Sequence, residues 1–140
     1  MRIEVFDALD STNEEAKRRA LAGETGPVWI VARAQSAGRG RRGRAWTSAQ
    51  GNLFATGLFT LEAGPGKAAQ LSFAAALAVG DMAASVIGPD TVRLKWPNDV
   101  LVEGEKLAGI LLESGSAPGG GLWLAVGIGV NLAHHPEDAE

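Results

Sequence analysis

The stretch VRLKWPNDVLVEGEKLAGILLE, residues 92–113, indicates the fold class more clearly than any other part of the chain. Val92 to Lys95 and Asp99 to Val102 are short β-rich runs on either side of a Trp-Pro-Asn turn. Glu103-Gly104-Glu105 is typical of a hairpin turn into a further strand, Leu107 to Glu113. Because strands joined by tight hairpins pair antiparallel, this segment predicts an antiparallel portion of a sheet.

The remaining segments predict further strands and two helices. A capping box is present at Ser11 with Glu14 and again at Thr12 with Glu15, and Gly23 is a helix stop, so a helix should lie between them. Two helices against about seven strands predict an α+β domain with a mixed, largely antiparallel sheet packed with helices. The second helix is apolar nearly all round and should be central to the packing. Strands are expected at 3–6, 28–32, 53–60 and 122–130, helices at 13–22 and 68–87, and a loop at 64–66.

The composition is that of a globular protein. The 140 residues are 46% hydrophobic and 21% charged, which suits one domain and excludes a disordered or fibrous chain. The absence of cysteine excludes a disulfide scaffold and a thiolate metal site, and it fits a reducing compartment. No signal peptide is evident at the N-terminus, and polar residues interrupt the apolar stretch 68–87. We therefore expect a cytoplasmic protein with no membrane partner.

Positive charge is concentrated in one window. Five of the 13 basic residues are arginines between Arg33 and Arg44, where no acidic residue occurs, which leaves 8 basic against 16 acidic residues elsewhere. Such a patch on an acidic protein indicates a local anion site, whereas duplex DNA binding usually spreads positive charge over a wider face. A nucleic-acid module is therefore the weakest alternative, and no nucleic-acid partner is expected.

Three other motifs fail on their context. Gly38 to Gly43 satisfies the G-x-G-x-x-G fingerprint of dinucleotide-binding folds, but Trp46-Thr47-Ser48 and a strand follow it instead of a helix. Gly66-Lys67 lacks both the first glycine and the Ser or Thr of a P-loop. His134-His135 has no spaced metal-binding partner and lies in a polar tail expected to be frayed. We accordingly predict no metal site in the protein and no nucleophile triad.

The arginine loop, Gln35 to Trp46, combines three properties that suit a nucleotide with a reactive phosphate. Its glycines let backbone amides approach a ligand closely. Its arginines are forked donors for phosphate or carboxylate, and Trp46 offers a face on which a purine could stack. On composition alone, a mobile solvated basic loop remains the alternative.

A second cluster lies nearer the C-terminus. Lys95 to Asp99 holds charged and amide groups on a proline-stiffened turn. Lys106 opens the following strand, and Gly109 is a point at which backbone can face a ligand. Asn131 ends the last predicted strand, where its amide could read an adenine edge or simply cap the strand.

These pieces, in this order, resemble the biotin protein ligase family, the biotin–[acetyl-CoA-carboxylase] ligases. The resemblance covers nearly the whole chain. It implies two steps: biotin and Mg-ATP give biotinyl-5′-AMP and pyrophosphate, and the biotinyl group then passes to a lysine of a biotin carboxyl carrier protein. The motifs that carry it are Asp10-Ser11-Thr12-Asn13, Gln35 with Gly38 to Arg44 and Trp46, Lys95 to Asp99, Lys106 to Ile110, and Gly127 to Asn131.

The resemblance also implies which residues form the site. Arg39, Arg41 and Lys106 would be catalytic, because their charges could neutralise the biotin carboxylate and the α-phosphate. Asp99 would be the candidate for contact with Mg²⁺. The biotin site would contain Ser11, Thr12, Asn13, Gln35, Gly38, Arg39, Gly40, Arg41, Lys106 and Gly109. The ATP or adenylate site would contain Arg39, Arg41, Arg44, Trp46, Lys95, Asn98, Asp99 and Asn131.

The resemblance is to part of a larger family architecture. Residues 1–140 would be a catalytic domain that is incomplete on its C-terminal side, with no DNA-binding domain before Ile3 and no C-terminal β-barrel domain. One alternative is a lipoate ligase or octanoyltransferase relative, which shares the fold class. Another is a truncated fragment that binds ligand without full activity. A homodimer is compatible with the resemblance.

Overall fold

The computed structural model describes residues 1–133, so the predicted tail with His134-His135 lies outside the described residues. The elements are β1 (Arg2–Phe6), α1 (Thr12–Leu21), β2 (Val28–Ala32), β3 (Leu53–Leu61), α2 (Pro65–Ala69), α3 (Leu71–Ile87), β4 (Val92–Lys95), β5 (Asp99–Val102), β6 (Glu105–Ser116) and β7 (Leu122–Val130). Two short 3₁₀ turns lie at Arg41–Gly43 and Pro89–Thr91.

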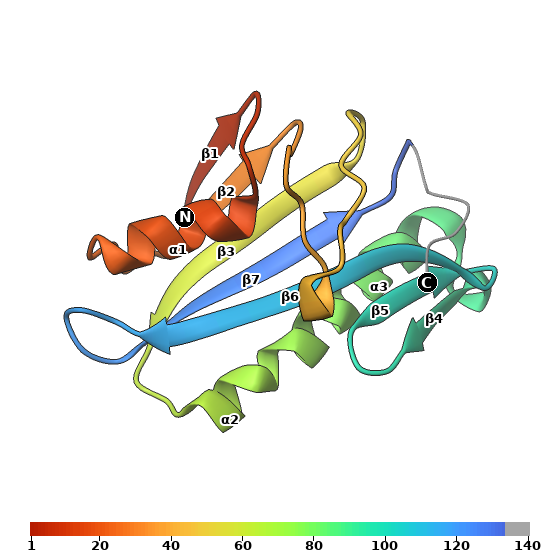
Figure 1. Cartoon of the computed structure of the whole chain (residues 1–140). Helices are drawn as coiled ribbons and strands as arrows, with labels where there is room; N and C mark the ends of the chain where they lie inside the picture. Colours follow the sequence, from red (N-terminus) through yellow and green to blue (C-terminus); the bar gives the residue numbers. More distant parts are fainter. Residues whose placement is uncertain (134–140) are drawn as a thin grey trace.

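The seven strands form one mixed sheet in the order β1-β2-β3-β7-β6-β5-β4 (Figure 1). Only the β1–β2 pair is parallel; every other neighbouring pair is antiparallel. The hairpins β4–β5 and β5–β6 occupy the segment 92–113 as predicted. The α+β class with a mixed, largely antiparallel sheet is therefore confirmed.

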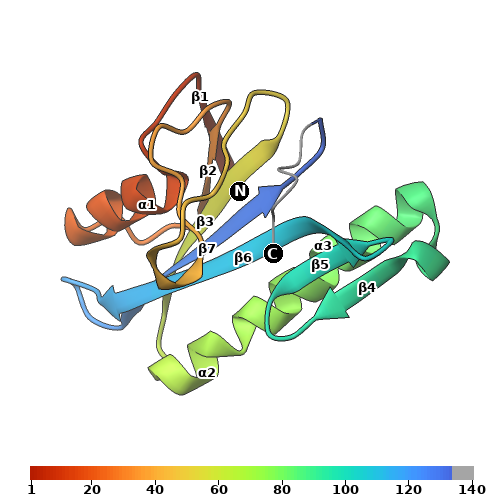
Figure 2. The same ribbon diagram turned by 45° about the vertical axis from the view of Figure 1, so that its right-hand side comes forward.

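The two longer helices pack on opposite faces of this sheet (Figures 1 and 2). Ala16 and Ala20 of α1 pack against a buried cluster that includes Val28 and Leu58. On the other face, α3 packs against a cluster centred on Leu124 and its neighbours in β5, β6 and β7. Because side chains alternate along a strand, β7 contributes Trp123 and Ala125 to the first cluster but Leu122, Leu124 and Val126 to the second. The sheet is thus the middle of three layers.

Helix α1 begins one residue earlier than predicted, at Thr12, and ends at Leu21. Ser11 is its N-cap, because the Ser11 Oγ accepts a hydrogen bond from the backbone N–H of Glu14 at 3.3 Å. Gly23, with φ of 101°, follows the helix end in the left-handed region that favours glycine. The cap and first turn place Ser11, Thr12 and Asn13 against the sheet, where all three are buried.

The predicted helix 68–87 differs from the structure in two ways. Pro65 begins the short helix α2, so of the predicted loop 64–66 only Gly64 lies outside a helix, and the helical stretch is divided at Gln70 into α2 and α3. Only one face of α3, with Ala76, Val79, Gly80 and Ala83, is buried. The opposite side exposes large apolar residues such as Leu77 and Val86, so the prediction of a wholly central helix was wrong.

The helical stretch Pro65–Ile87 is also long and apolar enough to cross a membrane. Length and apolar composition alone do not identify a membrane span, because core helices of globular proteins share both properties. Here the small residues of α3 lie directly on the sheet, and an added Cβ at Gly80 would be only 3.2 Å from Leu94.

Candidate functional site

A pocket of about 460 Å³ lies on the α1 face of the sheet, beneath the arginine loop. Its walls come from the start of α1, the loop between β2 and β3, the β4–β5 hairpin, and strands β6 and β7. All of the predicted site residues except Gly38 and Asn98 line it, although they come from segments far apart in the sequence. Residues not predicted for the site also line it, namely Arg42, Ala45, Thr47, Phe54, Ile110, Leu111, Gly127, Ile128 and Gly129.

Three glycines on neighbouring strands form the floor of this pocket. Gly109 of β6 pairs with Gly129 of β7, and Gly127 faces the same side two residues earlier. An added Cβ at Gly127 would overlap the Asn13 side-chain amide, and one at Gly129 would lie 2.7 Å from the indole of Trp46. Side chains on this floor would therefore displace both residues.

The Asn13 amide is held from both ends. Its Nδ2 donates to the Leu111 carbonyl at 3.2 Å and to Glu113 Oε1 at 3.0 Å. Its Oδ1 accepts from Thr56 Oγ1, 2.6 Å away, and the same hydroxyl lies 2.7 Å from Thr12 Oγ1. Thr56 itself is completely buried in β3. These contacts fix the position and orientation of Asn13 at the inner end of the pocket.

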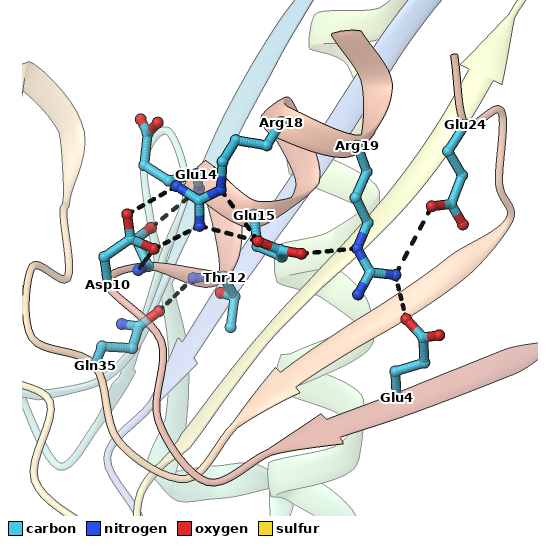
Figure 3. Close-up of polar contacts among 10 residues, drawn as sticks. Glu4, Asp10, Thr12, Glu14, Glu15, Arg18, Arg19, Glu24 and Gln35 are labelled. Atoms are coloured by element: carbon cyan, nitrogen blue, oxygen red, sulfur yellow. Dashed lines mark hydrogen bonds and ion pairs between the residues drawn. The ribbon is translucent and has the colours of Figure 1, made fainter. Parts of the chain in front are cut away.

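Gln35 ties the start of α1 to the arginine loop. Its Oε1 accepts from the Thr12 backbone N–H at 2.8 Å (Figure 3), and its Nε2 donates to Ser48 Oγ at 3.1 Å. Ser48 in turn donates to the Trp46 carbonyl at 2.9 Å. Gly38 lies outside the pocket lining, but an added Cβ there would be 2.8 Å from Gln35 Nε2 and would overlap Ser48. Gly38 thus makes room for this connection.

Two of the three predicted catalytic cations already have carboxylate partners. Arg39 Nη2 lies 2.6 Å from Glu14 and 2.9 Å from Glu113. Lys106 Nζ lies 3.3 Å from Asp99 Oδ1 and 5.1 Å from the ring centre of Trp46, a cation–π contact. These carboxylates neutralise part of the positive charge that Arg39 and Lys106 bring to the pocket.

The cation that stays unneutralised is Arg41. It lies exposed on the 3₁₀ turn Arg41–Gly43 at the pocket wall, and within residues 1–133 it forms no ion pair. Arg42 beside it has φ of 60°, which turns the chain sharply at this point. An anion in the pocket would therefore meet Arg41 with its charge uncompensated.

Two buried donors in the pocket wall have no hydrogen-bond acceptor in the described part of the chain. They are the Trp46 indole N–H and the Nε–H of Arg39. A buried unpaired donor is costly and in native proteins is usually satisfied by a water or ligand. The Trp46 ring lies over Gly109 and Gly129, so its unpaired N–H is located at the glycine floor of the pocket.

An ion-pair network supports the start of α1 from the solvent side (Figure 3). Arg18 donates to both carboxylate oxygens of Asp10, at 2.9 and 2.8 Å, and these hydrogen bonds lower the pKa of Asp10 to about 2. Burial disfavours the charged form of Glu15, but hydrogen bonds from Arg19 and Arg18 outweigh it and lower its pKa. Asp10 also accepts from the backbone N–H of Ser11 at 2.8 Å, so the network fixes the helix start.

The two asparagines of the predicted adenylate site make structural hydrogen bonds. Asn98 is buried outside the pocket lining, where its Nδ2 donates to the Ile110 carbonyl and joins β5 to β6. Asn131 Nδ2 donates to the Lys106 carbonyl at 3.1 Å, and its Oδ1 accepts from Asn52 at 3.4 Å. These contacts match the strand-capping alternative for Asn131, whose role toward adenine stays a prediction.

Four residues that organise the site were missed by the sequence reasoning. Asn52 Oδ1 accepts from the backbone N–H groups of Leu132 and Ala133, and Ser48 holds Gln35. Thr56 and Glu113 hold Asn13. Thr56 did leave a signal, since it is the polar residue in the run 53–59, where burial is costly unless the hydroxyl is hydrogen-bonded. Glu113 left none, because Ser114 and Ser116 follow it in the same strand.

Comparison with known proteins gives a consistent result. Residues 5–132 match the model of the biotin/lipoate A/B protein ligase family. The chain is 51% identical over 129 residues to a biotin–[acetyl-CoA-carboxylase] ligase of Paracoccus denitrificans, covering 91% of this chain and 53% of that protein. It is 40% identical over 135 residues to the bifunctional ligase/repressor BirA of Escherichia coli, covering 94% and 40%.

Solved structures that are similar to this chain also include biotin protein ligases. The biotin protein ligase of Leishmania major in complex with biotin superposes with a TM-score of 0.81 at 30% identity, covering 99% of this chain and 60% of that one. The biotin protein ligase from Aquifex aeolicus in complex with biotin and ATP gives 0.74 at 32%, covering 98% and 56%. The chain thus spans about half the length of the curated relatives it matches.

Proposed function

The chain belongs to the biotin/lipoate A/B protein ligase family, and from this premise we propose that it is the part of a biotin protein ligase that activates biotin with ATP. In the proposed reaction, a biotin carboxylate oxygen attacks the α-phosphorus of ATP, pyrophosphate leaves, and biotinyl-5′-AMP forms. The amine of a carrier-protein lysine then attacks the acyl carbon, an amide forms, and AMP leaves. The acceptor would be a biotin carboxyl carrier protein.

The observation that carries this proposal is the polar inner end of the pocket. Ser11, Thr12, Asn13 and Gln35 all line it, and the first three are more than nine-tenths buried. A ureido ring carries one carbonyl and two N–H groups, which can pair with such hydroxyls and amides. The dithiolane ring of lipoate has no such groups and would leave buried polar atoms unpaired, at a cost of about 1–3 kcal/mol each. This favours biotin over lipoate.

The other end of the pocket supports the chemistry of activation. The biotin carboxylate and the α-phosphate are both anionic, so they repel each other until positive charge is placed between them. Arg41 and Lys106 line the pocket, and a charge-assisted hydrogen bond from each contributes roughly 1.5–3 kcal/mol. The unpaired indole N–H of Trp46 offers one more donor on the same wall.

Magnesium would enter with the ATP phosphates. Among residues 1–133 no group of three or more acidic, histidine or cysteine side chains is placed to hold a metal ion. Asp99 is the carboxylate that lines the pocket, and hard oxygen ligands suit Mg²⁺. When bound, the ion would shield the phosphate charges, while the Asp99 carboxylate would orient it or keep Lys106 in position.

Biotin-dependent exchange of labelled pyrophosphate into ATP tests the proposal with the chain as it stands. We expect exchange with biotin and none with lipoate. Exchange driven by lipoate would instead favour the lipoate ligase alternative. Calorimetry with biotin alone separates the remaining case, because binding without exchange would identify a ligand-binding fragment that lacks full activity.

A further inference from the structure

We propose that Thr56 is a specificity-determining positioning residue, because its hydroxyl, oriented by Asn13, makes Thr12 face the ligand as a hydrogen-bond acceptor. The inference deepens the proposed function and rests on it. Thr56 is completely buried in β3 and does not line the pocket, so it acts on a ligand through Thr12.

The Asn13 amide has a single orientation that satisfies its neighbours. Its Nδ2 faces the Leu111 carbonyl at 3.2 Å and the Glu113 carboxylate at 3.0 Å. Both partners can only accept, so the nitrogen must point toward them and the oxygen away. Both hydrogens of the amide are then in use. Toward any ligand, Asn13 can offer only a lone pair of Oδ1.

The Asn13 orientation fixes the direction of the Thr56 and Thr12 hydroxyl hydrogens. Thr56 Oγ1 lies 2.6 Å from Asn13 Oδ1 and 2.7 Å from Thr12 Oγ1. A hydroxyl has one hydrogen, and the Asn13 oxygen has none, so Thr56 must donate to Asn13. The contact between the two threonines then requires Thr12 to donate to Thr56. The Thr12 hydrogen is thereby committed, and only its lone pairs remain for a ligand.

The Ser11 hydroxyl is a hydrogen-bond donor at the same end of the pocket. Ser11 Oγ accepts from the Glu14 backbone N–H at 3.3 Å, and in the described part of the chain its own hydrogen has no acceptor. The inner end of the pocket therefore offers one free hydroxyl donor beside two acceptors. A planar ligand group with one carbonyl between two N–H groups matches this pattern, and a group with an acceptor in place of either N–H meets a fixed lone pair.

The test compares Thr56→Val, which has nearly the same shape without the hydroxyl, with Thr56→Ser, which restores it. The ligands are biotin and the two cyclic carbamate analogues in which one ring N–H is replaced by oxygen. Calorimetry should show that wild type prefers biotin, and that Thr56→Val reduces this preference by roughly tenfold or more, since about 1.4 kcal/mol is tenfold. Once released, the Thr12 hydroxyl can rotate and donate to the ring oxygen. Thr56→Ser should keep the wild-type preference.

An equal loss of affinity for biotin and both analogues in Thr56→Val would overturn the inference, because that is the result of a merely structural role. Melting temperatures of all three proteins check the fold. A readout without ligand separates this inference from the proposed function: in ¹³C-labelled protein the Thr12 hydroxyl proton should be detectable by NMR in wild type and lost by fast exchange in Thr56→Val. If biotin does not bind at all, the proposed function fails, and this proton still decides the hydrogen-bond direction.

Discussion

Glu113 joins the arginine loop to the floor of the pocket, because its Oε1 lies 2.9 Å from Arg39 Nη2 and 3.0 Å from Asn13 Nδ2. The arginine loop is thus held at Arg39 by a carboxylate from β6, together with Glu14 of α1. The neighbouring Arg41 and Arg42 are exposed.

Replacing Glu113 by Gln should loosen this attachment. The neutral amide can still accept from Asn13 but removes one of the two charges that hold Arg39, leaving only Glu14. We expect trypsin to cut after Arg41 or Arg42 several-fold faster in Glu113→Gln than in wild type, and biotin plus ATP to slow the cleavage in both. Cleavage at equal rates, with equal melting temperatures, would show that the ion pair does not restrain the loop.

Lys106 should be needed for activation and not only for packing. Its side chain is only 17% exposed, between Asp99 and the Trp46 ring, so Lys106→Met keeps much of the apolar contact while removing the charge. If Lys106 neutralises the acid–phosphate junction, pyrophosphate exchange should fall roughly 100-fold or more.

The matched control for Lys106 is Asp99→Asn, which removes the ion pair and leaves the cation in place. We expect it to retain much more exchange than Lys106→Met. A Lys106→Met protein that melts like wild type and exchanges pyrophosphate at the same rate would refute the catalytic assignment.

The sheet was predictable where local signals and burial agree. The hairpin segment 92–113 and the capping box at Ser11 both led to elements that the structure contains. The helix start at Pro65 was not predicted, because Pro65-Gly66 is typical of a loop while Pro65 is in fact at the first position of a helix. The partial exposure of α3 was also missed. Its surface is apolar nearly all round, so the sequence does not indicate which face of the helix packs on the sheet.

Some residues of the site were predictable from local motifs and others were not. Residues grouped in motifs, such as Gln35 and Lys106, were placed in advance on segments that line one pocket. Glu113 and Thr56 were not, because their role depends on strand register. Asn13 meets Glu113 across 100 positions of sequence and Thr56 across 43, and no local pattern encodes such pairings.

The glycine floor should be intolerant of even one methyl group. Gly127→Ala places a Cβ where the Asn13 amide oxygen lies, and the strand backbone cannot move away without breaking the sheet. We expect biotin affinity to fall at least roughly tenfold, since about 1.4 kcal/mol of lost pairing suffices. The matched control is Gly119→Ala, whose Cβ would have no atom within 4 Å. Biotin affinities that are equal in the two variants would contradict the packing of Asn13 on Gly127.

The Asp10–Arg18 pair should make a small pH-dependent contribution to stability. The pKa of Asp10 is lowered in the folded protein to about 2, so the contribution is complete above the unfolded pKa, near 3.8, and is lost as the pH falls toward 2. The side chains of Asp10 and Arg18 are 42% and 50% exposed, so we expect less than about 1 kcal/mol. Asp10→Asn retains the acceptor for the Ser11 N–H and removes only the charge. Urea unfolding should therefore show wild type more stable than Asp10→Asn at pH 6, with the difference shrinking between pH 4 and pH 2 and in high salt. A difference that stays constant over that pH range would show that the charge of Asp10 does not stabilise the start of α1.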